Sequence, residues 1–211
     1  MKGGVLTLNK VDFQVAGGKF HFSGDYDPRQ AGNPLFDFNI DIMEMDIQDA
    51  FSHLKILRDL APAAEHTEGI FSGKYALTGQ LSAEMLPLSE TIKGEGEIQI
   101  GRAKINGMKL FERMSKATKK GHINDPHVRD LVIKTSIENN RLTVKPFSAK
   151  ISGFNTDIEG IQNFSGVLNY IVKIELLPIE KLKIPFHISG TYNDPKVAIG
   201  KGHKLPEENK P

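Results

Sequence analysis

Residues 36–42 alternate strictly between apolar and polar side chains: they read Phe36-Asp37-Phe38-Asn39-Ile40-Asp41-Ile42. Because successive side chains of a β-strand point to opposite faces, this order places all four apolar residues on one face of a strand. Similar alternation recurs at 71–81, 131–137 and 164–176. We therefore predict several strands, each with one covered face and one solvated face.

Short turn sequences separate the apolar runs. Gly17-Gly18 can join a strand at about 5–16 to one at 19–27, and Asn139-Asn140 can supply the positive φ angles of a two-residue hairpin turn. Ser152-Gly153 and Ser165-Gly166 mark further bends. Because parallel pairing would need long crossovers, these short connections predict an antiparallel meander.

The alternation changes phase at two places. Ile42 and Met43 are adjacent apolar residues, and a similar change lies between Ile100 and 103–105. A change of one residue moves the apolar set to the other face, so the strand must bulge, bend or end there. These irregularities predict a strongly curved sheet.

Two amphipathic helices are expected beside the strands. The first is predicted at about 47–60, with Asp46 as its N-cap and Pro62 beyond its end. The second is predicted at about 107–119, with Gly121 as its C-terminal stop. We expect both to pack on the sheet, although two short helices cannot cover about ten strands.

The fold prediction is therefore mainly β: a curved antiparallel meander sheet with two short amphipathic helices. Its apolar face is either left open as a groove or closed as a sandwich, and the pattern fits both. We predict one domain over residues 1–199 and a disordered tail over 200–211.

Composition argues against several classes of function. The chain has 27 basic and 26 acidic residues, interleaved, so no nucleic-acid partner is expected. Cysteine is absent, and the seven histidines lack the spacing of a metal site, so we predict no metal and no cofactor. Lys116, Lys119 and Lys120 are expected to complement the dipole of the second helix rather than to bind anionic lipid.

A catalytic site was sought among the carboxylates, because paired acids can hydrolyse glycosides. Asp37 and Asp41 share one face of a predicted strand, with Asn39 between them. A solvated polar face opposite the apolar residues explains the same pattern, so we predict no enzyme. A carbohydrate-active β-sandwich remains a distant alternative.

Several segments, taken in order, resemble the C-terminal region of AsmA-family proteins of the type common in Bacteroidetes. They are Asp46-Ile47-Gln48-Asp49-Ala50-Phe51, Glu68-Gly69-Ile70-Phe71-Ser72-Gly73, Ile92-Lys93-Gly94-Glu95-Gly96-Glu97-Ile98-Gln99-Ile100, Asn139-Asn140-Arg141-Leu142-Thr143-Val144-Lys145-Pro146-Phe147 and Gly190-Thr191-Tyr192-Asn193-Asp194-Pro195. The resemblance implies a periplasmic protein with an apolar β-sheet groove, related to bridge-like lipid-transfer proteins and acting in outer-membrane lipid homeostasis and assembly. It also implies an inner-membrane anchor, an N-terminal helix that this chain lacks.

The function expected from the sequence is a non-enzymatic module that binds or passes the acyl chains of lipids or phospholipids. The candidate groove residues are Phe71, Tyr75, Leu77, Leu168, Tyr170, Val172 and Ile174. The alternative is a structural or assembly module that docks other envelope proteins through strand edges without binding lipid. The N-terminus lacks the apolar core of a signal peptide, so export requires a targeting segment outside this sequence.

Overall fold

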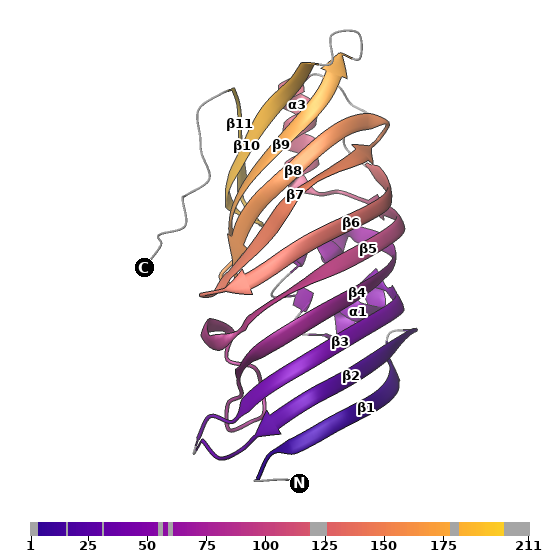
Figure 1. The fold of residues 1–211 in the computed structure, drawn as a ribbon. Helices are drawn as coiled ribbons and strands as arrows, with labels where there is room; N and C mark the ends of the chain where they lie inside the picture. Colours follow the sequence, from indigo (N-terminus) through magenta and orange to yellow (C-terminus); the bar gives the residue numbers. More distant parts are fainter. Residues whose placement is uncertain are drawn as a thin grey trace.

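A computed structural model describes residues 4–15, 17–30, 32–54, 57–58, 61–118, 126–177 and 182–200. Eleven antiparallel strands form one curved sheet in which each strand pairs with the next one along the chain (Figure 1). The predicted meander is confirmed, and the sheet is open. Its strands are β1 Leu6–Val15, β2 Gly18–Asp27, β3 Leu35–Asp46, β4 Thr67–Gln80, β5 Lys93–Ile105, β6 His127–Glu138, β7 Arg141–Ile151, β8 Phe154–Asn163, β9 Val167–Leu177, β10 Leu182–Thr191 and β11 Pro195–Ile199.

The hairpin turns have the backbone angles that their sequences predict. Asn139 and Asn140 join β6 to β7 with φ of 52° and 58°, and Ser152 and Gly153 join β7 to β8 with φ of 48° and 86°. Two consecutive residues with positive φ form the type I′ turn, whose twist matches that of the flanking strands.

Both predicted phase changes are bulges. In β3 the pairing with β4 shifts between Ile42 and Met45, and Glu44 has a φ of 54°. In β5, Ile100 and Arg102 pair with adjacent residues of β4, so Gly101 has no opposite residue. Because a bulge bends its strand and increases its twist, these two positions contribute to the curvature of the sheet.

The first helix, α1 (Ile47–His53), is shorter than the predicted 47–60: it stops before Leu54, although Leu57 and Arg58 are again helical. Asp46 caps its start as predicted, its side chain accepting a hydrogen bond from the Asp49 backbone N–H at 2.9 Å. The helix ends at Leu54, which is extended, and the Arg58 guanidinium donates to the carbonyls of Phe51 and Ser52, both at 2.9 Å. A 3-10 helix, η1 (Pro62–His66), leads into β4.

The second predicted helix is α3 (Lys109–Thr118), close to the predicted 107–119. Its predicted stop, Gly121, lies outside the described residues, as do Lys119 and Lys120. Gly107 precedes the helix with a φ of 63°. A further short 3-10 helix, η2 (Ser89–Thr91), lies before β5.

Both helices lie on the same face of the sheet, behind it in Figure 1. Each covers one apolar cluster. The α1 cluster consists of Met45, Ile47, Ala50, Ala64, Phe71, Ala103, Val128 and Leu131. The α3 cluster consists of Phe111, Met114, Val172, Ile174, Phe186 and Ile188.

Candidate functional site

Two apolar rows cross the first four strands on the helix-bearing face. Strand register places Val11, Phe22, Ile40 and Tyr75 side by side in one row, and Leu8, Gly24, Phe38 and Leu77 in the next. Tyr75 and Leu77 lie on the same side of β4 as Phe71 of the α1 cluster, because they are separated from it by even numbers of residues. We call these two rows the apolar slot. Its side chains are Leu8, Val11, Phe22, Phe38, Ile40, Tyr75 and Leu77.

Over β2 and β3 the rows on either side of the apolar slot are covered, whereas their β1 ends, Phe13 and Leu6, are exposed. Toward α1, Phe20 and Ile42 pack against the α1 cluster. On the other side, Phe36 lies against Gly79, and the Tyr26 hydroxyl donates to Met85 Sδ at 3.6 Å, so the connection between β4 and β5 reaches β2. The residues of the apolar slot belong to neither cluster.

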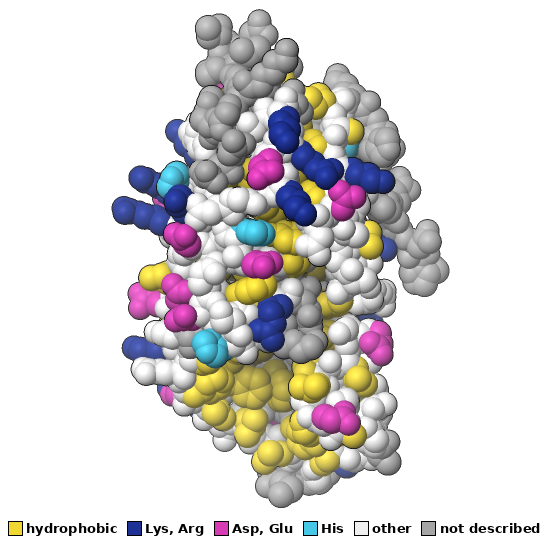
Figure 2. All heavy atoms as spheres, turned by 180° about the vertical axis from the view of Figure 1, so that it is seen from behind, with side chains coloured by type: hydrophobic (Ala, Val, Ile, Leu, Met, Phe, Trp, Pro, Cys, Tyr) yellow, Lys and Arg dark blue, Asp and Glu magenta, His cyan; other side chains and the backbone are white. Residues whose placement is uncertain are grey.

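Exposure of the apolar slot is greatest at β1. Val11 is 37% exposed, and its neighbours on this edge strand, Leu6 and Phe13, are also exposed. Figure 2 shows the helix-bearing face, where apolar side chains gather around a hollow at the lower end, over the first strands. Aromatic contacts line this region: the Phe22 and Phe38 rings lie 4.3 Å apart, and those of Phe13 and Phe20 lie 4.7 Å apart.

Tyr75 bridges three strands at the inner end of the apolar slot. Its ring lies over Gly96 of β5, where a Cβ atom would be 2.4 Å from Tyr75 Cδ1. Its hydroxyl is 3.0 Å from Thr135 Oγ1 on β6. Burial raises the pKa of Tyr75, and the hydrogen bond with Thr135 partly offsets this. An aromatic ring over a cross-strand glycine fills the space that the missing side chain leaves.

The same arrangement recurs near α3. The Tyr170 ring lies over Gly160 of β8, where a Cβ atom would be 2.2 Å from Tyr170 Cδ1. Its hydroxyl donates to Gln162 Oε1 at 3.0 Å, and burial raises the pKa of Tyr170. Here the tyrosine packs against the α3 cluster instead of facing an uncovered row.

The seven candidate groove residues are divided among three environments. Phe71 is buried in the α1 cluster, and Val172 and Ile174 are buried in the α3 cluster. Leu168 and Tyr170 are half-buried beside the α3 cluster. Tyr75 and Leu77 belong to the apolar slot.

Sequence reasoning did not assign the five other residues of the apolar slot to the groove. Alternation had shown that Phe38 and Ile40 share a face. However, the pairing of β3 with β2 and β4 was needed to place them beside Phe22 and Tyr75.

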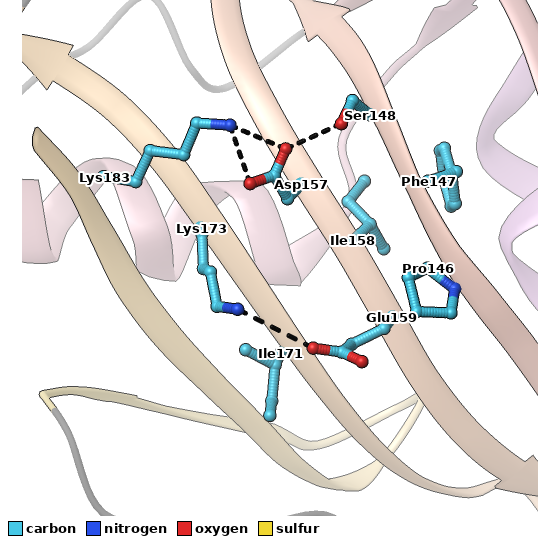
Figure 3. Close-up of a pocket in the computed structure, with 9 residues that line it drawn as sticks. All are labelled: Pro146, Phe147, Ser148, Asp157, Ile158, Glu159, Ile171, Lys173 and Lys183. Atoms are coloured by element: carbon cyan, nitrogen blue, oxygen red, sulfur yellow. Dashed lines mark hydrogen bonds and ion pairs between the residues drawn. The ribbon is translucent and has the colours of Figure 1, made fainter. Parts of the chain in front are cut away.

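The opposite face carries paired charges. Lys74 lies 3.7 Å from Asp41. Further along this face is a depression of about 460 Å³. In it, Lys183 Nζ donates to both carboxylate oxygens of Asp157 at 2.7 Å, and Lys173 lies 3.8 Å from Glu159 (Figure 3). Partial burial opposes ionisation of Asp157, but hydrogen bonds from Lys183 and Ser148 outweigh it and lower its pKa. Lysine–carboxylate pairs of this kind are typical of a solvated ionic surface.

Within the described ranges, no three His, Cys, Asp or Glu side chains are grouped as metal ligands. No helix in the same ranges has the length and apolar content to cross a membrane. Comparison of the chain with family models, curated proteins and solved structures finds no match.

Proposed function

We propose that this protein is a non-enzymatic lipid-handling module of the periplasm, and that it binds lipid acyl chains in the apolar slot. The observation that carries the proposal is the pair of uncovered apolar rows between the α1 cluster and the connection from β4 to β5. Large apolar surfaces left open on a folded protein commonly serve binding.

The chemistry of the apolar slot favours an acyl chain over a peptide. Tyr75 carries the only polar group among its seven side chains, and that hydroxyl already bonds Thr135. A peptide placed there would bury backbone N–H and C=O groups without partners, which is costly, whereas a hydrocarbon chain has no polar groups to satisfy. Each methylene buried contributes roughly 0.8 kcal/mol.

The width of the apolar slot also favours an acyl chain, because the slot is too narrow for a helix. Same-face neighbours along a strand are about 7 Å apart, so two rows present a narrow strip. A helix with its side chains is about 10–12 Å across and would meet α1 or the connection from β4 to β5. The AsmA-type motifs in the sequence support the same reading, and with it a role in outer-membrane lipid homeostasis and envelope assembly.

Paired valine substitutions test the proposal. Val11→Glu places a carboxylate in the apolar slot at an exposed position, and Val132→Glu places one at a 47% exposed position on the opposite face. We expect protein purified without detergent to carry lipid, measured by mass spectrometry of a denaturing extract, and to take up a fluorescent fatty acid. Val11→Glu should reduce both at least tenfold, because burying an unpaired charge is costly. Val132→Glu should reduce neither.

The proposal fails if the unmodified protein neither carries lipid nor takes up the fatty acid. Equal losses in both variants would also contradict it, because they would show an effect of charge without regard to position. Circular dichroism of each variant establishes that the sheet is retained.

A second candidate function is docking of another envelope protein at the β1 edge. The observation that favours it is that β1 ends the sheet: among the described residues, no strand pairs with its outer side. Such an edge can accept a further strand. In this case a photo-crosslinking residue at Asn9 would capture protein, and Val11→Glu would leave the lipid content unchanged.

A further inference from the structure

We infer that the apolar slot is blind: it opens at β1, ends at Tyr75, and accepts one acyl chain with the tail end first. This inference rests on the proposed function and adds to it the orientation of the ligand and a residue that selects its chain length. It follows from three observations on the two rows: their burial, the side chains at their inner end, and their length.

Side chains in the two rows are more deeply buried at β6 than at β1. In the row of Val11, which is 37% exposed, Thr135 on β6 is 2% exposed and Ile188 on β10 is 1% exposed. In the row of Leu8, Ile137 on β6 is 2% exposed. A ligand can therefore lie over β1 to β4 but meets buried side chains at β6, where both rows are closed.

Two side chains of β4 form the end wall. Tyr75 lies over Gly96, and Leu77 lies over Gly94, where a Cβ atom would be 2.8 Å from Leu77 Cδ2. Because β5 has glycine at both row positions, the β4 side chains occupy the space above it. The hydrogen bond between the Tyr75 and Thr135 hydroxyls holds the ring across the row.

The length of the apolar slot suits one lipid tail. Three strand spacings of about 4.8 Å separate β1 from β4, so the rows run for about 14 Å before the end wall. One leaflet of a membrane contributes about half of a hydrocarbon core of roughly 30 Å, which is about 15 Å. A single tail entering at β1 would reach Tyr75 without needing to fold back.

A series of saturated fatty acids of roughly ten to twenty carbons, measured by competition with a fluorescent fatty acid, tests the inference. In the unmodified protein, affinity should rise by about fourfold per methylene until the tail reaches Tyr75, and then level off. Tyr75→Ala removes the ring and opens the space over Gly96, so affinity should continue to increase with chain length beyond this point. Leu77→Trp enlarges the end wall, so affinity should stop increasing at a shorter chain length.

Tyr170→Ala is the matched control, because it removes the same type of tyrosine-over-glycine contact beside the α3 cluster. It should leave the chain-length profile unchanged. If the unmodified protein binds fatty acids but Tyr75→Ala and Leu77→Trp keep its profile, the blind end is wrong and the proposed function stands. If no chain length binds to the unmodified protein, the proposed function itself is wrong.

Discussion

The two edge strands of the sheet differ in length and in how they are covered. At β1, a ten-residue strand leaves Leu6, Val11 and Phe13 exposed. At the other edge, β11 has five residues, begins at Pro195, and is held by α3. Arg113 donates to the Pro195 carbonyl and, at 2.8 Å, to Asp194 Oδ1, while Lys109 donates to the Asn193 carbonyl at 3.2 Å.

This difference shows that the placement of the helices, rather than the strands themselves, divides the sheet into a core and a candidate binding site. Both ends contain the same antiparallel pairing and a tyrosine ring over a glycine. Only the C-terminal end places Phe111 and Met114 of α3 over its rows. A short edge strand with proline and a covering helix is also protected against pairing with other chains, whereas β1 is not.

The largest expected difference between the ends is in the cost of removing a phenylalanine. Phe186 is fully buried in the α3 cluster, so Phe186→Ala should lower the free energy of unfolding by about 3–5 kcal/mol. Phe22 in the apolar slot is half-buried, so Phe22→Ala should cost only about 1–2 kcal/mol. Urea unfolding measures both; equal costs would mean that the two ends are equally well packed.

Alkaline pH should distinguish the two tyrosines. Burial raises the pKa of Tyr170 above its usual value near 10, so the unfolded chain loses this proton first. The contribution to stability is therefore constant below about pH 10 and is lost as the pH rises, by up to about 1.4 kcal/mol per pH unit. Tyr170→Phe should remove this loss. Tyr75→Phe should remove less, because the hydrogen bond with Thr135 offsets part of the shift. Unfolding at several alkaline pH values tests this order.

The smallest expected effect comes from removing the hydrogen bonds that join α3 to the β11 edge. Arg113→Met removes the contacts to Asp194 and Pro195 and should cost about 1 kcal/mol, since the side chain is partly exposed. Hydrogen exchange of β10 and β11 amides should become faster. Arg29→Met, which breaks an exposed pair with Asp27 inside one turn, should not change exchange at β10 or β11. Unchanged exchange in Arg113→Met would show that packing alone holds this edge.

Local sequence chemistry was enough to predict most of the sheet. Alternation marked the strands, Asn139-Asn140 marked a hairpin turn, and the adjacent Ile42 and Met43 marked a bulge. Each of these features depends on neighbouring residues in the chain. The N-cap at Asp46 is equally local, and it too was confirmed.

The position of the uncovered rows could not be predicted in the same way. Alternation indicates which side of a strand is apolar, but not what packs on that side. Val172 and Ile174 have the same pattern as Tyr75 and Leu77, yet α3 covers the first pair and leaves the second uncovered. At the early end of α1, the Phe51 carbonyl is capped by the side chain of Arg58, seven residues further along the chain. The resemblance to the AsmA family, and the lipid function that it implies, stay predictions.

The strictly sequential pairing of the strands also has a consequence for how the chain folds. Every strand is hydrogen-bonded only to the strands before and after it in sequence. The average separation between contacting residues therefore stays small for an all-β protein, and low contact order is associated with fast folding. As in repeat proteins, assembly can start at any hairpin and spread to its neighbours, so fraying at β1 need not spread to β10.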